Sequence, residues 1–456
     1  MMTVSAFLKQ AAAVRPSKRQ LDWFDTEFYG FVHFSPNTFT GREWGLGDED
    51  PAIFNPAKLD ARQWVEAMKS AGMKGLVLTA KHHDGFCLWP SKYTEHSVKN
   101  SPYRGGKGDI VAEAAQACRE GGLKFGFYLS PWDRNCPFYG TDRYNDYYKA
   151  QLTELLTQYG EIFHVWFDGA CGEGPNGRRQ EYDFDGYIQL IRQYQPNATI
   201  FNDRGPDVRW IGNEAGEPRA AEWAVVPSEL VGLAAVQTGP GPLPGDLSHM
   251  YNSDRDIGYL SNILYSKGLA FAGSEVDMSI RKGWFYHPEE EPHSLERLFD
   301  TYLNSVGANA CFHLNVPPTP EGLFDPRDVR RLKELGDKLR SSFARDLTDS
   351  AQVEYLPVLP GETQCRVDIR FPQPVTLRYL TLAEDIAQGQ RVESFVLMRR
   401  DDFGQWKSFY AGSCIGHKKI CRLTGWDGSD GVTLDQLRIF VTAARDQVQW
   451  RRIAAY

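Results

Sequence analysis

The sequence predicts an α/β protein in which a (β/α)8-like, TIM-type barrel over residues 1–345 is followed by an antiparallel β-sandwich over residues 346–456. Three observations lead to this prediction. Short apolar runs alternate with longer segments of helical periodicity through most of the chain, as parallel βα units require. Polar residues stand where these apolar runs end. Beyond residue 345 the pattern changes to short, turn-bounded runs, which is typical of a sandwich.

Seven apolar runs are the predicted barrel strands, and most are followed by a segment with helical spacing. Their ranges are 28–34, 75–80, 124–130, 162–168, 198–203, 269–275 and 310–316. A closed barrel of this type has eight strands. We expect the eighth near 221–226 or 258–263.

Five segments between these runs have the apolar spacing of helices, and each ends at or near Gly or Pro, where helices stop. They are 59–72, 109–122, 144–160, 183–195 and 293–307. The segment 325–342 is the predicted last helix of the barrel, and the Pro/Gly-rich stretch 238–246 predicts a long rim loop. The predicted sandwich strands are 353–358, 365–371, 377–385, 391–400, 406–413 and 437–444.

Composition narrows the classes of partner. The 456 residues carry a net charge of -8 without a long block of Lys and Arg, which argues against a nucleic acid or an anionic membrane. No run of 18 apolar residues occurs, so we expect no membrane insertion. The start of the chain lacks the pattern of a signal peptide. The localisation stays unknown, because a cytoplasmic protein and an exported one whose signal has been removed would look the same.

Polar residues follow the ends of the predicted strands. They are His33, Ser35, Lys81 to Asp84, Ser130, Asp168, Asp203, Glu275 and Asn315. Active sites of (β/α)8 barrels are built at the carboxyl ends of the strands. A single polar residue there is often only a helix cap. Because so many polar residues follow strand ends, we predict that they lie together at one mouth of the barrel.

Asp168 ends the run VWFDGA, in which Gly169 and Ala170 leave space in front of the carboxylate. That placement suits a nucleophile, and the alternative is a helix-capping aspartate. Glycoside hydrolysis needs a second carboxyl group whose raised pKa keeps it protonated. Glu214 is a candidate, because it lies in a glycine-flanked loop with Trp210 nearby. Its rivals are Glu217, Glu222 and Glu275.

The run KHHDGF places His82 and His83 just past a strand. As neutral imidazoles they could hydrogen-bond sugar hydroxyls, and as single residues they could equally be satisfied core histidines. The sequence lacks H-x-H and HExxH spacing, and its eight cysteines form no CxxC pair, so we predict no metal site. Dinucleotide, phosphate-loop and nucleophile-elbow motifs are also missing, and no cofactor is expected.

Five segments taken together resemble the α-L-fucosidases of glycoside hydrolase family 29, and they occur in the family's order. They are FVHFSPNTFTGREWG, LTAKHHDGFCLWPS, KFGFYLSPWD, VWFDGA and RWIGNEAG, and weaker similarity extends through residue 395. The resemblance implies hydrolysis of terminal α-L-fucose with retention, through a covalent fucosyl-enzyme intermediate. It implies a fucosylated oligosaccharide or glycoconjugate as the partner, and it matches the nucleophile to Asp168.

The same resemblance suggests the residues of a fucose pocket. The family's histidines match His33, His82 and His83, and further candidates in the matching segments are Trp44, Tyr128, Trp210 and Trp284. Trp284 could pack against the C6 methyl group of fucose. The acid/base differs between branches of the family. The segment GNEAG resembles the branch that uses Glu214 and prefers α-1,3- and α-1,4-linked fucose on Lewis-type glycans.

Other functions stay open at this point. One is a catalytically silent fucose-binding protein on the same fold, and another is an α-L-fucosidase of broad specificity. A third is an inverting glycosidase, and a fourth is a metal-dependent hydrolase built on His82, His83 and Asp84. Inverting enzymes separate their two carboxyl groups by roughly 6.5–9.5 Å, and retaining enzymes by about 5 Å.

Overall fold

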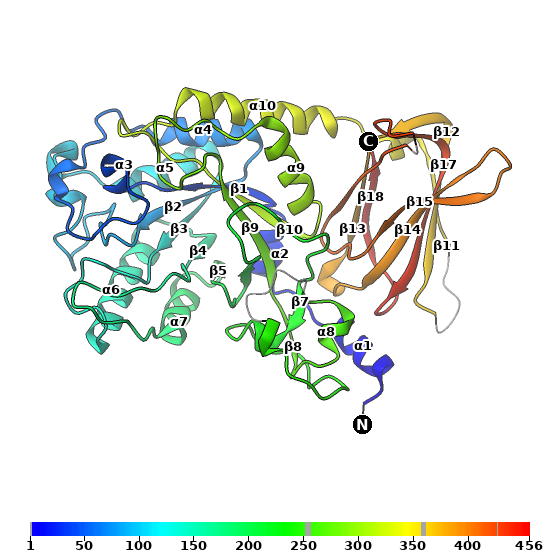
Figure 1. Cartoon of the computed structure of the whole chain (residues 1–456), viewed down its shortest axis with the longest axis horizontal. Helices are drawn as coiled ribbons and strands as arrows, with labels where there is room; N and C mark the ends of the chain where they lie inside the picture. The colour runs from blue at the N-terminus through cyan, green and yellow to red at the C-terminus, as the bar shows by residue number, and fades with distance from the viewer. Residues whose placement is uncertain (1, 251–256, 357–361, 426) are drawn as a thin grey trace.

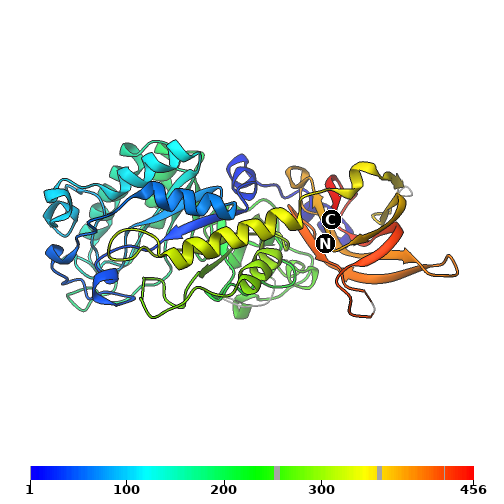
Figure 2. The same ribbon diagram turned by 90° about the horizontal axis from the view of Figure 1, so that it is seen from above.

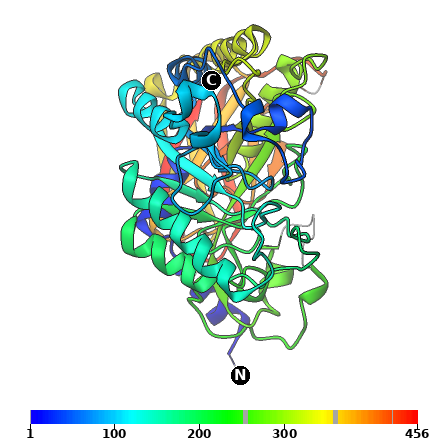
Figure 3. The same ribbon diagram turned by 90° about the vertical axis from the view of Figure 1, so that its left-hand side faces the viewer.

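The computed structural model describes residues 2–250, 257–356, 362–425 and 427–456. A barrel forms one end of the molecule and antiparallel sheets form the other (Figure 1). Seen from above, helix α10 (Pro326–Ser342) runs along the barrel toward these sheets (Figure 2). Viewed from the barrel end, the C-terminal sheets lie behind the barrel (Figure 3). Within the described residues, no helix has the length and apolar character needed to span a membrane.

Eight parallel strands close the barrel in the order β1-β10-β9-β6-β5-β4-β3-β2, which confirms the predicted fold class. The strands are β1 (Phe28–Val32), β2 (Gly75–Lys81), β3 (Lys124–Leu129), β4 (His164–Trp166), β5 (Thr199–Phe201), β6 (Val208–Trp210), β9 (Gly273–Ser279) and β10 (Ala310–Asn315). Six of them fall on predicted runs, and β9 shares only residues 273–275 with the predicted run 269–275, whose first residues form β8.

The prediction of the eighth strand was wrong. The eighth barrel strand is β6, not 221–226 or 258–263. The first of those ranges contributes to β7 (Val225–Pro227), which pairs with β8 (Leu269–Phe271) in a separate two-stranded sheet, and the second contains helix α8 (Leu260–Ile263). The strand β6 was missed because it has three residues and follows β5 after the turn 202–207, with no helix between them.

The six predicted helices are present as α4 (Ala61–Ala71), α5 (Ile110–Gly121), α6 (Asp142–Gln158), α7 (Phe184–Tyr194), α9 (Leu295–Ser305) and α10. Aspartates accept backbone N–H groups at the start of four of them: Asp60, Asp109, Asp183 and Asp325. The other α-helices are α1 (Val4–Ala12), α2 (Lys18–Phe24) and α3 (Asn37–Thr40). Short 3-10 turns lie at Pro51–Ile53, Val98–Asn100, Tyr103–Gly106, Ser228–Leu230, Ser248–Met250, Leu347–Ser350 and Ile386–Gln388.

The C-terminal part is a pair of antiparallel sheets with the strand orders β11-β12-β17-β14-β15 and β16-β13-β18. Their strands are β11 (Gln352–Leu356), β12 (Cys365–Leu377), β13 (Tyr379–Glu384), β14 (Val392–Arg400), β15 (Trp406–Gly412), β16 (Lys419–Arg422), β17 (Val432–Ala444) and β18 (Trp450–Ala455). Apolar residues from both sheets form one core. The end of the predicted run 353–358 lies outside the described residues.

Buried polar contacts join the C-terminal sheets to the barrel. Asn309 Nδ2 donates to the carbonyl of Glu222 at 2.7 Å, and the N–H of His417 donates to Asn309 Oδ1 at 2.6 Å. The guanidinium carbon of Arg445 lies 3.6 Å from the centre of the Trp223 ring. These contacts fix the segment that follows the loop carrying Glu214.

Candidate active site

The predicted mouth forms at the carboxyl ends of the barrel strands. Side chains reach it from seven of the eight strands or from the residues directly after them: His33, His82, Tyr128, Asp168, Asp203, Trp210 and Asn315. All but Asp168, Asp203 and Trp210 are buried. The arrangement is that of a barrel active site.

Asp168 lies two residues beyond β4 and is held by donors on both oxygens. The Tyr128 hydroxyl donates to Oδ2 at 2.9 Å, and the N–H of Ala170 donates to Oδ1 at 2.8 Å. Burial raises the pKa of Asp168, and these two donors oppose the rise because they favour the ionised form. A carboxylate fixed in this way is oriented for attack on a bound substrate.

Gly169 leaves room for a third carboxyl group beside Asp168. A Cβ atom at Gly169 would stand 2.1 Å from Oδ2 of Asp203, so any other residue there would displace the Asp203 carboxyl group. Burial raises the pKa of Asp203 to about 6, and the charges of Asp168 and Glu214 contribute to the rise. Asp203 is therefore a third carboxyl group beside the two candidates.

Glu214 occupies the loop after β6, and the indole N–H of Trp284 donates to its Oε2 at 3.1 Å. Burial raises the pKa of Glu214, the Trp284 hydrogen bond opposes that rise, and the negative charges of Asp168 and Glu43 add to it. A raised pKa is the property that a general acid requires.

The three rival glutamates differ in environment. Glu222 is buried between Arg209 and Arg219, with both ion pairs at 3.0 Å. Glu217 is exposed, and its backbone N–H is bonded to Asn213. The Glu222 carboxylate is therefore engaged by two guanidinium groups, and Glu217, which is exposed like Glu214, lacks the indole donor that Glu214 has.

Glu275 was expected at the carboxyl end of its strand, and this placement was wrong. The strand β9 continues to Ser279, so Glu275 lies inside the barrel and is fully buried. Trp166 Nε1 and His313 Nδ1 contact its Oε1 at 2.7 and 3.0 Å. Burial opposes its charge, but the imidazoles of His313 and His164 outweigh burial and hold the pKa of Glu275 well below its usual range. It cannot serve as an acid.

His33 presents an acceptor nitrogen to the mouth. Asn315 Nδ2 donates to Ser279 Oγ and to the carbonyl of Trp284, at 2.9 and 2.8 Å, which turns the amide oxygen toward His33. That oxygen lies 2.9 Å from His33 Nδ1, so Nδ1 carries the proton and Nε2 is the acceptor. Burial lowers the pKa of His33 to about 3, which keeps the ring neutral.

His82 and His83 both lie at the site, because β2 ends at Lys81 and the chain turns. The Ser130 hydroxyl donates to the carbonyl of Trp132 at 2.6 Å, and it accepts from His83 Nδ1 at 2.7 Å. His83 Nε2 is 3.6 Å from Asp168 Oδ2. Burial lowers the pKa of His83 to about 3, and the charges of Arg134 and Lys81 act in the same direction.

His82 stacks on Tyr128 with the ring centres 5.6 Å apart, and its buried Nδ1 has no hydrogen-bond partner among the described residues. Asp84 points elsewhere: it accepts from Ser35 Oγ at 2.6 Å and from the N–H of Phe86 at 2.8 Å. The described ranges contain no group of three or more His, Cys, Asp or Glu that could hold a metal ion.

Aromatic side chains border the mouth. Trp284 lies 4.9 Å from His33 between ring centres, and Trp210 Nε1 donates to Asp277 Oδ1 at 2.8 Å. Trp44 is 55% exposed and meets the His83 ring edge-on at 5.7 Å. The mouth thus brings together Asp168, Glu214 and the predicted pocket residues, with Trp44 at the rim, whereas Glu275 and Asp84 lie away from it.

The comparison with known proteins decides the family. The sequence model of the family named Alpha-L-fucosidase matches residues 10–215 and 270–342, which cover most of the barrel. The chain belongs to the α-L-fucosidases of glycoside hydrolase family 29. It is therefore a glycoside hydrolase that acts on fucose-containing substrates.

Relatives of this fucosidase match along most of its length. Alpha-L-fucosidase 1 of Arabidopsis thaliana is 41% identical over 433 residues, covering 89% of this chain and 81% of the plant protein. A family 29 member from an unknown rumen bacterium is 38% identical with a TM-score of 0.83, covering 98% of this chain and 78% of the other. A Ruminococcus gnavus fucosidase whose structure was solved in complex with fucose is 30% identical with a TM-score of 0.82. The match covers 97% of this chain and 95% of the other.

Sequence reasoning missed two acidic residues of the fucosidase site. Asp277 is buried beside Trp210, and burial together with the charges of Glu275 and Glu214 raises its pKa well above the usual value. Alternation along β9 could have found it, because residues 275, 277 and 279 share one face of the strand. Glu43 accepts the N–H of Trp284 at 2.8 Å and contacts His287, and no local pattern indicates this long-range contact.

Proposed function

We propose that the protein is a retaining, exo-acting α-L-fucosidase that removes terminal α-1,3- or α-1,4-linked L-fucose from branched, Lewis-type glycans. Asp168 is the nucleophile and Glu214 the general acid/base. The observation that carries the proposal is the unlike environment of the two carboxyl groups at one mouth. Asp168 has donors on both oxygens, whereas Glu214 has one donor and a pKa raised by burial and by Asp168.

The reaction has two steps. In the first, an oxygen of Asp168 bonds to C1 of fucose while the C1–O bond to the glycan breaks, and Glu214 gives its proton to the leaving oxygen. In the second, Glu214 takes a proton from water, the water oxygen bonds to C1, and Asp168 leaves as a carboxylate. Two inversions at C1 give α-L-fucose, so the configuration is retained.

The histidines bind the sugar in this proposal. His33 and His83 are neutral, and in each the Nε2 atom is free to accept from a fucose hydroxyl because Nδ1 is bonded to Asn315 or Ser130. The buried, unpartnered Nδ1 of His82 supports a role for that ring at the site as well. Trp284 offers an apolar face for the C6 methyl group.

The preference for branched glycans rests on the loop that carries Glu214. Its GNEAG segment resembles the branch with α-1,3/1,4 preference, and Trp44 is an exposed aromatic surface at the rim where a neighbouring sugar could stack. A broad-specificity enzyme would not need this surface.

The test is proton NMR of the enzyme with N-acetyllactosamine carrying α-1,3-linked fucose, and with an aryl fucoside in parallel. We expect α-L-fucose to appear before mutarotation and the branched sugar to be cleaved faster. The β-anomer as first product would contradict retention, and equal rates on both substrates would indicate broad specificity. Asp168→Ala should keep its fold and lose turnover; a variant with near-normal turnover would place the nucleophile elsewhere.

A further inference from the structure

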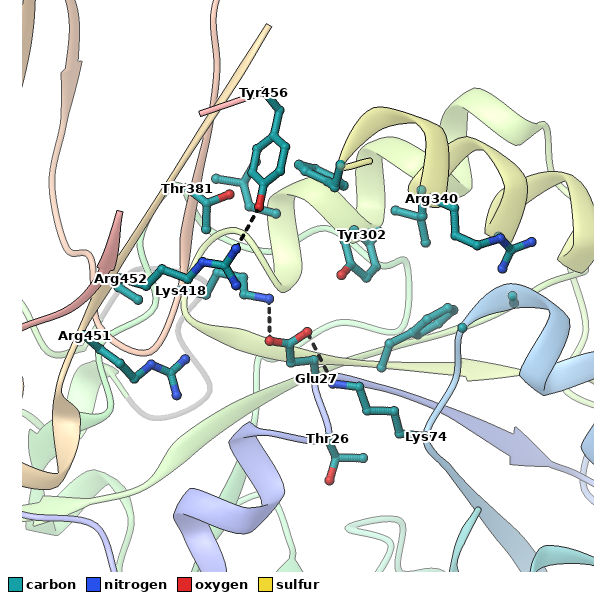
Figure 4. Close-up of a pocket in the computed structure, with 18 residues that line it drawn as sticks. Thr26, Glu27, Lys74, Tyr302, Arg340, Thr381, Lys418, Arg451, Arg452 and Tyr456 are labelled. Atoms are coloured by element: carbon teal, nitrogen blue, oxygen red, sulfur yellow. Dashed lines mark hydrogen bonds and ion pairs between the residues drawn. The ribbon is translucent and has the colours of Figure 1, made fainter. Parts of the chain in front are cut away.

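A second cavity lies at the end of the barrel opposite the carboxyl groups, where the residues before β1 and β2 meet the C-terminal sheets (Figure 4). Its volume is about 480 Å³, within the range of cavities that hold small-molecule ligands. Helices α4, α9 and α10 and strands β13, β16 and β18 also contribute to its walls. The cavity is thus built by both parts of the molecule.

The lining of this cavity is cationic, whereas the whole chain has a net charge of -8. Glu27 is its one acidic residue, and the cationic side chains are Lys74, Arg340, Lys418, Arg451 and Arg452. A cavity lined by one sign of charge concentrates ligands of the opposite sign. Three of these cations also pair with acidic residues outside the lining, Arg340 with Asp337, Arg451 with Asp25 and Arg452 with Asp346, so an anion has to use the donors that these pairs leave free.

Two of these cations, Lys418 and Lys74, interact with Glu27 inside the cavity. Glu27 forms a close ion pair with Lys418, and its Oε2 lies 3.7 Å from Lys74 Nζ. Figure 4 shows this group between the barrel and the sheets. Burial opposes the Glu27 charge, but His417, Lys418 and Lys74 outweigh burial and hold the pKa of Glu27 well below its usual range. Glu27 is thus neutralised by its neighbours and does not repel an incoming anion.

The cations at the rim keep donors for a ligand. Arg452 contacts Asp346 and the Tyr456 hydroxyl through Nη2, both at 3.4 Å, which leaves its Nε and Nη1 groups without a partner among the described residues. Its side chain is 61% exposed, and that of Lys74 is 51% exposed. Lys74 has three N–H donors and gives one to the carbonyl of Asp25 at 2.8 Å.

Aromatic side chains lie among the cations of the lining, and the Tyr456 hydroxyl contacts Arg452. Phe28 and Tyr302 meet edge-to-face with ring centres 5.7 Å apart, and Phe343 meets Tyr456 at 5.1 Å. The side-chain hydroxyls of Tyr302 and Thr381 make no hydrogen bond with the described part of the chain, and Figure 4 shows both residues at the cavity. A ligand that fills this space has an apolar face as well as a charge.

We propose that this cavity binds a small organic acid, namely a carboxylate or sulfate carried on a ring-sized body. The anionic group lies against the cationic side chains of the rim, Arg452 or Lys74, and the ring packs on the aromatic side chains. An inorganic anion would leave those aromatic side chains uncovered. Since both parts of the molecule line the cavity, a bound ligand stabilises their association and raises the unfolding temperature.

The test uses the full chain, with isothermal titration calorimetry and thermal unfolding at fixed ionic strength. The probes are two sugar acids, glucuronate and N-acetylneuraminate, and the aryl anion phenyl sulfate. The control compounds are inorganic sulfate, which has the charge but no ring, and glucose, which has the ring but no charge. We expect at least one ring anion to bind and to raise the unfolding midpoint, and sulfate and glucose to do neither. The responsive probe then distinguishes a sugar acid from an aryl acid.

The double variant Lys74→Ala/Arg452→Ala should weaken binding at least about tenfold, because each lost charged hydrogen bond is worth at least that factor. Arg422→Ala is the matched control. Arg422 lies in the same sheet, is 56% exposed and pairs with Asp300 at 3.2 Å, but it does not line the cavity. Saturating L-fucose should leave anion binding unchanged, because the carboxyl groups lie at the other end of the barrel.

Four results would overturn the proposal. They are no binding of any ring anion at about 10 mM, equal binding of sulfate, full binding by the double variant, and displacement of the anion by fucose. A loss of binding in Arg422→Ala equal to that in the double variant would also contradict it, because general charge would then explain the effect.

Discussion

The two carboxyl groups at the mouth acquire different properties from their neighbours. Asp168 accepts from Tyr128 and Ala170, so its ionised form is favoured against burial. Glu214 has one indole donor and stands in the field of two other acids, so its protonated form is favoured. An enzyme that needs one ionised and one protonated carboxyl group can obtain both in this way.

Replacing Glu214 tests the acid role. Glu214→Ala should lower kcat on a fucosylated oligosaccharide by about 10²–10⁴-fold, the usual contribution of general acid catalysis. The loss should be much smaller on a dinitrophenyl fucoside, whose leaving group needs no proton. Steady-state kinetics on both substrates checks this. Glu217→Ala, three residues along the same loop, is the control and should behave as the parent. Equal losses on both substrates would assign Glu214 to binding instead.

The position of the alkaline limb in the pH profile should respond to the neighbours of Glu214. The Trp284 hydrogen bond lowers the pKa of Glu214, so Trp284→Phe should raise it and move the alkaline limb to higher pH. The Glu43 charge raises that pKa, so Glu43→Gln should move the limb to lower pH. Profiles of kcat/KM on an oligosaccharide measure both shifts. Shifts of the same sign would show that another group controls the limb.

At the scale of elements, periodic segments and apolar runs were predictable, including the three-residue strands β4 and β5, whereas a short strand without an apolar run was not. The helices 59–72 and 109–122 were predicted within two residues of α4 and α5, because apolar spacing and the terminal Gly72 and Gly122 mark them. The strand β6 has three residues with Arg209 in the middle, so no apolar run marks it. Its pairing with β5 and β9 identifies it, and pairing is a long-range property.

The prediction of the site residues has the same limit, because it depends on features of the local sequence. Residues that follow a strand, such as Asp168 and His33, could be recognised from local sequence, and the resemblance to family 29 placed Glu214. Contacts between distant loops, such as Glu43 with Trp284, could not be recognised, because nothing in either segment specifies the other. A domain division at residue 345, between α10 and β11, stays a prediction.

Glu275 belongs to the structure of the barrel, and its replacement should reduce stability. Glu275→Ala leaves the buried donors of Trp166 and His313 without their acceptor and should cost about 3–5 kcal/mol of unfolding free energy. The conservative change Glu275→Gln keeps an acceptor oxygen and should cost less. Urea unfolding at neutral pH measures both. A loss below about 1 kcal/mol in Glu275→Ala would contradict this role.

The ionisation of Glu275 also predicts the direction in which acid changes the free energy of unfolding. Its pKa is lower in the folded than in the unfolded protein, so its stabilisation is complete above the unfolded value of about 4.3 and is lost as pH falls toward the folded value. The parent protein should therefore lose more stability than Glu275→Gln does as the pH falls below about 4.3, whereas the two should respond alike between neutral pH and that value. Equal losses below that value would show that Glu275 does not contribute to acid unfolding.

At the scale of the whole molecule, the barrel separates two regions with different tasks. The carboxyl ends of its strands hold the catalytic groups, and the other end meets the C-terminal sheets. The C-terminal part also contacts residues 222–223, which follow the loop of Glu214: Arg445 lies over Trp223, and the N–H of His417 donates to Asn309 of the barrel, which in turn donates to the carbonyl of Glu222. Lys419 Nζ adds a hydrogen bond to the carbonyl of Ala220 at 3.0 Å. The sheets therefore brace the segment that follows the Glu214 loop, and Glu214 is the proposed general acid.

Asn309 tests this bracing, because it is 2% exposed and its side chain joins the carbonyl of Glu222 to the N–H of His417. Asn309→Ala loses both hydrogen bonds and should cost about 2–4 kcal/mol of unfolding free energy. Its φ of 67° is unfavourable for alanine, so Asn309→Gly is the control that loses the same bonds without that strain. Denaturant unfolding gives both losses, and kinetics on an oligosaccharide gives the functional effect. If the sheets brace the Glu214 loop, both variants lower kcat; if kcat is unchanged while stability falls, the sheets stabilise the barrel without positioning the acid.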